Sequence, residues 1–312
     1  MILLMIFLAL AAAICAAGIY IARKFVYPRC RDLDTTWQMG LEAGEYTPED
    51  TSDAEAWELQ SAYGYILRGV MVKPPQPRGV VVLCHGHRHS WHGTIKYWRI
   101  FRELGYVICA YNHRFHGDSG GENCSAGWFE ARDLQQVITT LRDRFPDLPV
   151  GLLGESMGGA AVLQFMELGD PVDFIIADCP YSSMEAAYRH QLSMRLIPPL
   201  LHSPIIAVAS WYIRIRAGFS IGDVSALRCS MTQDTPVLLV HGDADSYIPM
   251  SMSEDICTSR RRLYPTELLV VPEARHADAW RRDPREYTRR AKSFILDAIE
   301  VRRVSGTPVG QG

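Results

Sequence analysis

The sequence predicts an α/β protein with a mostly parallel central sheet and helices on both faces of that sheet. Two observations carry this prediction. Short runs rich in valine, leucine and isoleucine, such as residues 79–84 and 106–111, are typical of strands buried on both faces. Segments with a helical repeat of apolar residues lie between these runs, and this alternation is typical of parallel sheets. With 312 residues, the chain is long enough for one large domain of this class.

The individual elements follow in chain order. Residues 65–72 are expected to form an early antiparallel strand. Further strands are predicted at 79–84, 106–111, 149–153, 173–177, 235–240 and 267–271. Amphipathic helices are predicted at 95–104, 131–145 and 284–301, where apolar residues recur at helical spacing.

The first 21 residues form an apolar segment that an ordinary soluble protein does not have. They contain no charged side chain, and about 20 apolar residues are enough to cross a bilayer as a helix. Arg23 and Lys24 follow directly, and no basic residue precedes the segment. A cleaved signal peptide normally has a basic start and a shorter apolar core, and a buried core helix would need cover on every face. We therefore expect an uncleaved single-pass transmembrane helix, with the rest of the chain in the cytoplasm by the positive-inside rule.

Changes of composition along the chain suggest a domain plan. Residues 22–58 are polar, acidic and punctuated by proline and glycine, and they are expected to connect the anchor at 1–21 to a main domain at 59–303. Within this domain the strand–helix rhythm breaks at about 181–232, where apolar pieces are interrupted by prolines. Such a helical insertion suits a cap over a pocket, although two packing helices without a ligand would give the same pattern. Residues 304–312 are expected to form a tail.

Charge and cysteine content argue against several classes of protein. The net charge of −3 and the pI of about 6.4 give no sign of a nucleic-acid partner. The eight cysteines are scattered and contain no Cys-x-x-Cys pair, so a structural zinc site is not expected. Free thiols agree with a reducing compartment. We expect neither a metal nor an organic cofactor.

The segment Gly154-Glu155-Ser156-Met157-Gly158 is the most informative motif in the chain. It follows a short apolar strand and leads into a segment that can form a helix. A serine on such a sharp strand-to-helix turn has a strained backbone and an exposed hydroxyl, and the flanking glycines avoid collisions with neighbouring backbone. We interpret Ser156 as a catalytic nucleophile.

A serine hydroxyl needs a base to take its proton, and the base needs an acid to orient it. His276 follows the last predicted strand and is the candidate base, since histidine suits proton transfer near neutral pH. Asp243 and Asp245 follow the preceding strand and are the candidate acids, with Asp178 as a weaker alternative. All these positions come at the carboxyl ends of strands, so we expect them at the same edge of the sheet.

Attack on a carbonyl also requires donors for the oxygen that gains negative charge. The N–H of Met157 follows the nucleophile at the start of a helix, whose dipole favours an anion there. The second donor is expected from the loop after residues 79–84, and the N–H of His87 is our choice. Met157 and His87 are therefore the predicted oxyanion hole.

At this point the chain resembles the α/β-hydrolase family, in particular bacterial membrane-anchored members of the serine-aminopeptidase-like branch, which includes esterases. The resemblance covers roughly residues 64–301. The segments that carry it are His85-Gly86-His87, Asn112 to Ser119, Gly154 to Gly158, and His241 to Pro249 together with His276.

The resemblance implies an α/β-hydrolase fold and assigns roles to several residues. It implies that Asp245 is the acid and that Asp243 is a structural turn residue. It also implies a structural role for His85, which argues against a metal site formed with the nearby His89 and His92. The chain departs from the family pattern where Asn112 replaces an acid and Phe115 replaces a glycine.

These features together predict a serine hydrolase that cleaves a small-molecule carboxylic ester through an acyl-enzyme. The anchor and the apolar insertion favour an apolar, lipid-derived ester. A serine peptidase or a thioesterase on the same fold is the alternative within enzymes. The alternative from another class is a non-catalytic, membrane-tethered binding module, which a missing triad member would indicate.

Overall fold

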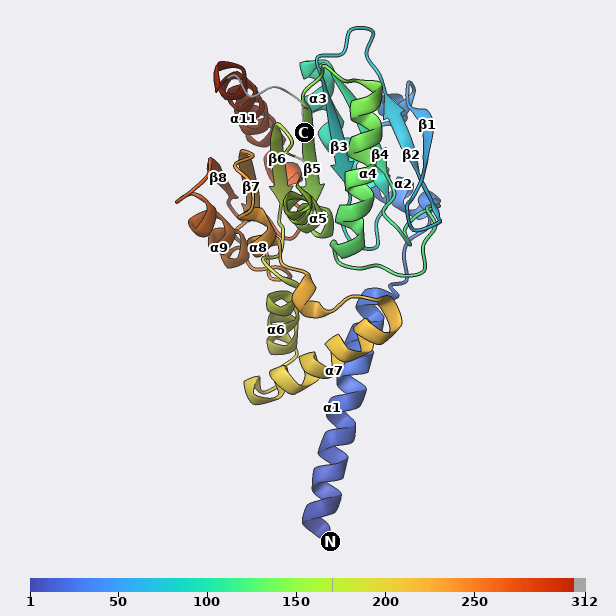
Figure 1. The fold of residues 1–312 in the computed structure, drawn as a ribbon, viewed down its shortest axis with the longest axis vertical. Helices are drawn as coiled ribbons and strands as arrows, with labels where there is room; N and C mark the ends of the chain where they lie inside the picture. The colour runs from blue at the N-terminus through green and yellow to red at the C-terminus, as the bar shows by residue number, and fades with distance from the viewer. Residues whose placement is uncertain (170, 306–312) are drawn as a thin grey trace.

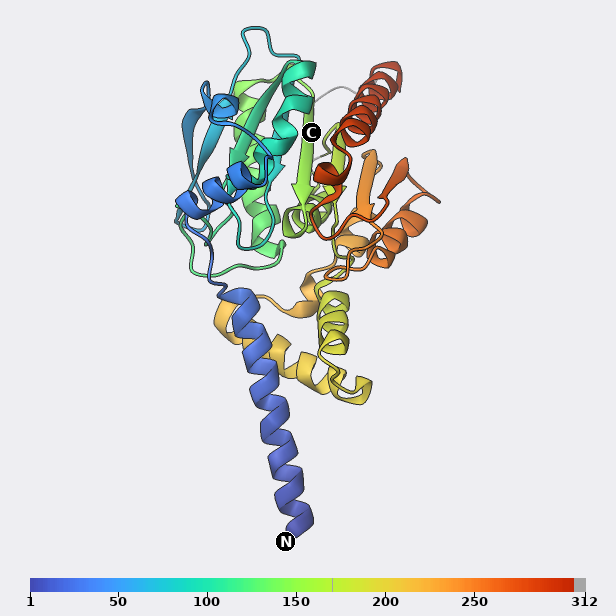
Figure 2. The same cartoon turned by 180° about the vertical axis from the view of Figure 1, so that it is seen from behind.

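The protein is described from a computed structural model, which covers residues 1–169 and 171–305, with side chains as far as residue 301. An eight-stranded sheet lies between two layers of helices (Figures 1 and 2). The strand order in the sheet is β1-β2-β4-β3-β5-β6-β7-β8. The strands are β1 (Glu55–Gln60), β2 (Ile66–Val72), β3 (Gly79–Cys84), β4 (Tyr106–Tyr111), β5 (Val150–Glu155), β6 (Phe174–Asp178), β7 (Val237–Gly242) and β8 (Thr266–Val271).

The sheet is parallel from β4 to β8 and antiparallel at the edge formed by β1 and β2. In register, Cys84 at the end of β3 pairs with Tyr111 on one side and with Gly154 on the other. The carboxyl ends of these strands therefore meet at one edge. The predicted fold class is confirmed, and β3 and β4 have the predicted bounds.

Helices cover both faces of the sheet. The α-helices are α1 (Ile2–Val26), α2 (Leu33–Glu42), α3 (Trp98–Leu104), α4 (Trp128–Arg144), α5 (Met157–Phe165), α6 (Met184–Met194), α7 (Pro199–Ala217), α8 (Ala226–Ser230), α9 (Ser251–Arg260), α10 (Ala279–Arg282) and α11 (Pro284–Ser305). Short 3-10 helices are η1 (Pro48–Thr51), η2 (Trp91–Tyr97), η3 (Met166–Leu168) and η4 (Ile221–Asp223). One core, on the side of α4 and α5, receives Val80 and Val82 of β3; the other, on the side of α3 and α11, receives Val81 and Leu83.

The segment expected as a connector, residues 22–58, contains more structure than its polarity suggested. Helix α1 continues to Val26, α2 and η1 follow, and β1 starts at Glu55. Helix α2 begins at an Asp32 cap, whose carboxylate accepts the N–H of Thr35 at 2.6 Å. At the other end of the chain, the expected tail at 304–312 overlaps the end of α11 by two residues. The remaining residues, 306–312, lie outside the described residues.

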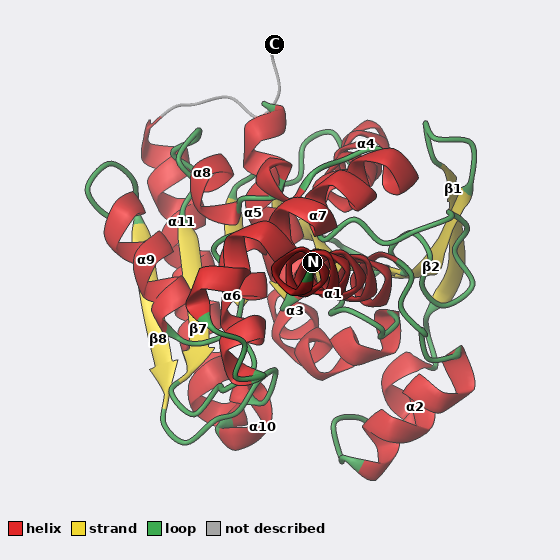
Figure 3. Ribbon diagram, turned by 90° about the horizontal axis from the view of Figure 1, so that it is seen from below, coloured by secondary structure: helices red, strands yellow, loops and turns green. Residues whose placement is uncertain are grey.

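The segment between β6 and β7 forms α6, α7, η4 and α8, and α6 and α7 stand away from the sheet (Figure 1). Helix α7 starts with Pro199 in its first turn, where a missing N–H has no cost. It ends at Gly218, which has a left-handed φ of 78°. Figure 3 shows α1 almost end-on, with α6 and α7 beside it.

Helix α1 has an exposed half and a packed half. Its 25 residues have a mean hydropathy of 2.8 over the most apolar 18-residue stretch, so it is long and apolar enough to cross a membrane. Residues 1–10 are exposed and extend away from the body (Figures 1 and 2). Gly18, Ala22 and Val26 are buried, and a Cβ at Gly18 would lie 2.7 Å from Val208 Cβ of α7. The second half of α1 is therefore part of the packed fold.

Candidate active site

Ser156 lies at the carboxyl end of β5, at the sharp turn into α5. Its backbone has φ 55° and ψ −112°, a positive-φ conformation that strains a residue with a side chain. The N–H of Ser156 donates to Asp178 O at 2.7 Å, which ties the turn to β6. A Cβ at Gly154 would lie 2.2 Å from Gly158 O, and a Cβ at Gly158 would lie 2.1 Å from Cys84 O. Both flanking glycines are therefore required by space.

The structure brings Ser156, His276 and Asp245 together from three different loops. His276 lies between β8 and α10, and Asp245 lies just after β7. Ser156 Oγ is 2.8 Å from His276 Nε2, and His276 Nδ1 is 2.7 Å from Asp245 Oδ2. When the Nδ1–H donates to the carboxylate, Nε2 is the acceptor that faces the serine hydroxyl. This chain of hydrogen bonds has the geometry needed to activate a serine.

Asp245 is buried and held in its ionised form. Its Oδ1 accepts the backbone N–H groups of Tyr247 and Ile248, each at 2.9 Å. Its Oδ2 also lies 3.3 Å from His241 Nε2. Burial alone would raise the pKa of Asp245, but the hydrogen bonds from His241, His276 and the backbone outweigh it, and the pKa lies well below its usual value. The carboxylate is therefore charged where it faces His276.

The two other acids considered from the sequence have different positions. Asp243 Oδ1 accepts the N–H of Glu273 at 2.6 Å and so joins the loops after β7 and β8. Asp178 accepts a hydrogen bond from Tyr97 OH at 3.1 Å, inside the protein behind the serine. His276 is hydrogen-bonded to Asp245 and to neither of these acids.

The predicted oxyanion donors, Met157 and His87, line the same cavity as Ser156. Met157 is the first residue of α5, and the loop after β3 passes beside the serine, because a Cβ at Gly86 would lie 3.5 Å from Ser156 Cβ. The His87 imidazole turns toward α1: it stacks on the Phe25 ring at 4.8 Å, and its Nε2 lies 3.2 Å from Phe25 O. Burial lowers the pKa of His87 to about 4, so the ring is neutral and Nε2–H donates to that carbonyl.

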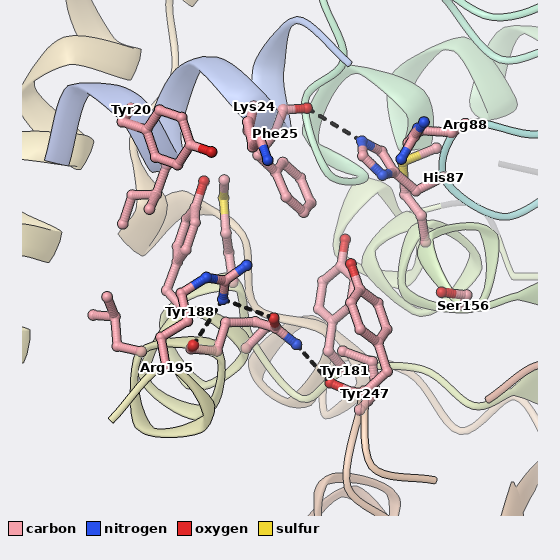
Figure 4. A pocket seen from close by; sticks show the side chains of 17 residues that line it. Tyr20, Lys24, Phe25, His87, Arg88, Ser156, Tyr181, Tyr188, Arg195 and Tyr247 are labelled. Carbon is pink, nitrogen blue, oxygen red and sulfur yellow. Dashed lines mark hydrogen bonds between the residues drawn. The ribbon is translucent and has the colours of Figure 1, made fainter. Parts of the chain in front are cut away.

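A cavity of about 240 Å³ opens in front of Ser156 (Figure 4). It is bounded by three parts of the chain: the end of α1, helix α6, and the loops that carry His87 and Tyr247. Most of its lining is apolar or aromatic, including Phe25, Tyr181 and Tyr188. The contribution of α1 was missed from the sequence, because Lys24 was interpreted there only as the flank of an anchor.

A buried charged cluster lies behind the serine, and it too was missed from the sequence. Lys96 Nζ is 2.5 Å from Glu155 Oε2 and 3.6 Å from Glu45 Oε1, and the lysine side chain is 4% exposed. Tyr97 OH donates to the same Glu155 oxygen at 2.8 Å. Lys96 Nζ also donates to Ala277 O at 3.4 Å. The cluster therefore joins the residue before Ser156 to the residue after His276.

Ion pairs and hydrogen bonds within this cluster determine which of its carboxyl groups are charged. Burial alone would raise the pKa of Glu155, but Lys96 and Tyr97 outweigh it and hold the pKa below its usual value. Burial, together with the nearby Glu155 charge, raises the pKa of Asp178 to about 6. Glu155 and Lys96 are thus a buried ion pair, with a second carboxyl group beside it that takes up a proton readily.

The loop at Asn112 is well held despite its departures from the family pattern. Asn112 Nδ2 donates to Asp118 Oδ1 at 2.7 Å, and Asn112 Oδ1 accepts the N–H of Trp91 at 2.8 Å. Phe115, which stands where the family has glycine, has a left-handed φ of 64°. His85 Nε2 accepts the N–H of His113 at 3.0 Å, which fits the expected structural role of His85.

One group of side chains has the spacing of a metal site. Cys179, Asp245 and His276 offer atoms within 4.8 Å of one another. Metal binding by cysteine requires the thiolate, and burial raises the pKa of Cys179 well above its usual value. Both nitrogens of His276 already face hydrogen-bond partners. These features favour the hydrogen-bonded triad over a metal site at this position.

Comparison with known proteins shows which family profile and which relatives the chain is similar to. The profile of the family described as "Serine aminopeptidase, S33" matches residues 75–211, a range that includes Ser156 and ends before Asp245 and His276. The chain is 29% identical to the uncharacterised protein YqkD of Bacillus subtilis, over 92% of this chain and 94% of that protein. It is 27% identical to a monoacylglycerol lipase of Mycolicibacterium smegmatis, over 68% of this chain and 85% of the lipase.

The fold is also similar to that of solved structures. The esterase Pf2001 of Pyrococcus furiosus superposes with a TM-score of 0.65 over 81% of this chain and 94% of the esterase. The two sequences are 20% identical, so this likeness concerns the fold.

Proposed function

Because the chain belongs to the α/β-hydrolase superfamily, we propose that it is a serine hydrolase that cleaves a carboxylic ester through an acyl-enzyme. The observation that carries this proposal is the hydrogen-bonded chain from Ser156 through His276 to Asp245, with distances of 2.8 and 2.7 Å. A buried, ionised carboxylate orients the imidazole and stabilises the cation that forms when the imidazole takes a proton.

In the first half of the reaction, Ser156 Oγ attacks the ester carbonyl and His276 Nε2 takes the hydroxyl proton. The carbonyl oxygen becomes an oxyanion, and the backbone N–H groups of Met157 and His87 donate to it. His276 then gives the proton to the departing alcohol, and the acyl group stays on Ser156. In the second half, His276 takes a proton from water, the water oxygen attacks the acyl carbon, and Ser156 leaves with its proton restored.

Two observations support an apolar, lipid-derived ester. The lining of the cavity is mostly apolar and aromatic, and one of its walls is the end of the membrane-length helix α1. A monoacylglycerol lipase is among the relatives of the chain. We propose that α1 crosses the membrane and that Arg23 and Lys24 keep the catalytic domain on the cytoplasmic side.

A peptidase of the kind that releases N-terminal residues is less well supported. Recognition of a substrate amine requires an acidic side chain in the pocket. No aspartate or glutamate lines the cavity in the part of the chain that the structure describes. The cavity therefore favours an ester over a peptide with a charged amino terminus.

Covalent labelling tests the proposed function. A fluorophosphonate probe should label the full-length protein in mild detergent, and Ser156→Ala should abolish both labelling and hydrolysis of p-nitrophenyl esters. Ser203→Ala, on the exposed face of α7, is the matched control and should keep both. Labelling that persists in Ser156→Ala would contradict the assignment. A folded protein that is never labelled and hydrolyses no ester would favour a non-catalytic binding module.

Esters of rising chain length test the substrate class. The kcat/KM of p-nitrophenyl esters should rise from acetate to dodecanoate, because a longer chain buries more apolar surface in the cavity. A strict preference for acetate would contradict an apolar substrate.

A further inference from the structure

Three cationic side chains line the cavity in front of Ser156, and they come from three different elements. Lys24 lies near the end of α1, Arg88 follows His87, and Arg195 follows the last turn of α6 (Figure 4). No acidic side chain lines the cavity, as far as the structure describes the chain. The lining therefore carries three positive charges and no negative charge.

None of these three cations forms an ion pair with another described residue. Lys24 Nζ lies over the Tyr20 ring at 5.1 Å. Arg88 Nε donates to Arg29 O at 2.9 Å, and Arg195 Nη1 donates to Gln191 O at 2.8 Å. These partners are uncharged. Several other arginines of the protein do pair with carboxylates, as Arg102 does with Asp53 and Arg290 with Glu267.

Unpaired charges of one sign around a cavity attract a ligand of the opposite sign. A concave, partly apolar site focuses the field of its charges and raises the local concentration of a complementary ion. The cations share this cavity with Ser156 and with Tyr247, whose ring lies 4.9 Å from the His276 ring. An anionic group bound here would therefore sit in the same cavity as the ester bond.

The surroundings of the cavity are apolar. The exposed half of α1 carries large apolar side chains, and the corner between α6 and α7 exposes Met194, Leu196 and Leu200, with Leu196 91% exposed. Figure 1 shows α7 running from this corner to the point where it crosses α1. Exposed apolar side chains near a membrane-length helix are typical of contact with lipid. A ligand with an apolar chain and an anionic end would match both the apolar surroundings and the cationic lining of the cavity.

We propose that the cavity selects a single-chain lipid ester whose headgroup carries an anionic phosphate or carboxylate, bound by Lys24, Arg88 and Arg195. This inference rests on the proposed hydrolase function and adds the charge of the substrate to it. The anchor helix then has a second role, since Lys24 belongs both to the membrane flank and to the substrate site.

Hydrolysis of two lipids with the same acyl chain tests the proposal. The full-length protein in neutral detergent is given 1-lauroyl-lysophosphatidylglycerol, which is anionic, or 1-lauroylglycerol, which is neutral, and the release of laurate is measured. The wild type should have the higher kcat/KM for the anionic lipid. Lys24→Gln combined with Arg195→Gln should lower the anionic-to-neutral ratio of kcat/KM about tenfold, mainly through KM, because two charges that meet the headgroup are lost.

Arg23→Gln is the matched control for Lys24→Gln. Arg23 is the neighbouring cation on the same helix and at the same membrane level, but it faces α7, where Nη1 donates to Tyr212 OH at 3.3 Å. It does not line the cavity. Arg23→Gln should leave the ratio within about twofold of wild type, since a rim charge outside the site adds little. Equal losses in Arg23→Gln and Lys24→Gln would show general attraction to an anionic surface and would overturn the proposal.

The remaining outcomes separate this proposal from the proposed function. Hydrolysis of 1-lauroylglycerol and labelling of Ser156, without any preference for the anionic lipid, would overturn the headgroup site and leave the hydrolase intact. A butanoyl analogue with the same headgroup that is cleaved as well as the lauroyl lipid would overturn the lipid part. Absence of both hydrolysis and labelling would overturn the hydrolase function and this inference with it.

Discussion

The charges on the two sides of Ser156 are arranged in opposite ways. Behind the serine, Lys96 and Glu155 form a buried ion pair 2.5 Å apart. In front of it, Lys24, Arg88 and Arg195 line an open cavity without an acidic partner. Charges that are paired inside the protein hold the loops of Ser156 and His276 in place, whereas charges left unpaired at a cavity are available to a ligand.

The largest effect is expected at Asp245, whose carboxylate is hydrogen-bonded to the His276 imidazole. Asp245→Asn removes the charge that orients His276 and stabilises its cation, and kcat for a p-nitrophenyl ester should fall about 10⁴-fold. Asp243→Asn is the control, because Asp243 only joins two loops through Glu273 N–H. Retention of more than a tenth of the wild-type kcat by Asp245→Asn would mean that another group orients His276.

The next effect concerns the buried pair itself. Lys96→Met leaves Glu155 charged and unpaired in the interior, which should lower the free energy of unfolding by about 3–5 kcal/mol, measured by urea in mild detergent. It should also lower kcat, because Lys96 donates to Ala277 O beside His276, the proposed base. Adding Glu155→Gln should restore most of the stability. A double variant as unstable as the single one would show that Lys96 acts by packing alone.

A smaller effect is expected where α1 packs against α7, near the cavity. A Cβ at Gly18 would lie 2.7 Å from Val208 Cβ and 2.8 Å from Ile205 O, so Gly18→Val should push α1 away from α7. Overpacking of this kind costs about 1–3 kcal/mol, and KM for lipid esters should rise because α1 forms a wall of the cavity. Ala13→Val, on the exposed half of the helix, should change neither quantity.

The smallest expected effect, counted per pH unit, is the dependence of the free energy of unfolding on pH. Burial lowers the pKa of His87, His92 and His113 to about 4 each, so these rings are neutral in the folded protein. An unfolded histidine takes up a proton below its usual pKa near 6.5, and the folded state does not. The stability they contribute is therefore present above pH 6.5 and is lost as the pH falls toward 4. Asp133 and Asp178, whose pKa values are each raised to about 6, work in the opposite direction over part of this window, so about one net proton is taken up on unfolding.

We expect the free energy of unfolding to fall by about 1 kcal/mol per pH unit between pH 6.5 and 4.5, since a net proton taken up on unfolding is worth that much. Thermal unfolding at a series of pH values measures it. His113→Gln should flatten the slope. A stability that stays level from pH 7 to pH 5 would contradict neutral, buried rings at His87, His92 and His113.

Strands and motif residues were predictable because their signals are local. Every position of β3 is apolar and buried, so its bounds could be read from composition. Strand β1 was missed because it pairs on one side only and carries Glu55 and Glu58, so it lacks the apolar run of a central strand. Helix α2 was missed because its polar composition resembles that of a loop.

The residues of the site likewise divide into those with a local sequence signal and those without one. Ser156, Asp245 and His276 lie in short motifs, and their chain order could be read from the sequence. The pairing of Lys96 with Glu155 could not, because the residues are 59 positions apart and no local pattern joins them. In the sequence, Lys24 was informative only about membrane topology. That it also lines the cavity follows from the packing of α1 on α7, which no local pattern predicts.

The stacking of Phe25 on His87 has a consequence for a shortened form of the protein. A form that begins after α1 would still carry Ser156, His276 and Asp245. It would lack the ring that stacks on His87 and one wall of the cavity. Its activity on lipid esters should therefore be lower, although all three residues of the proposed triad remain.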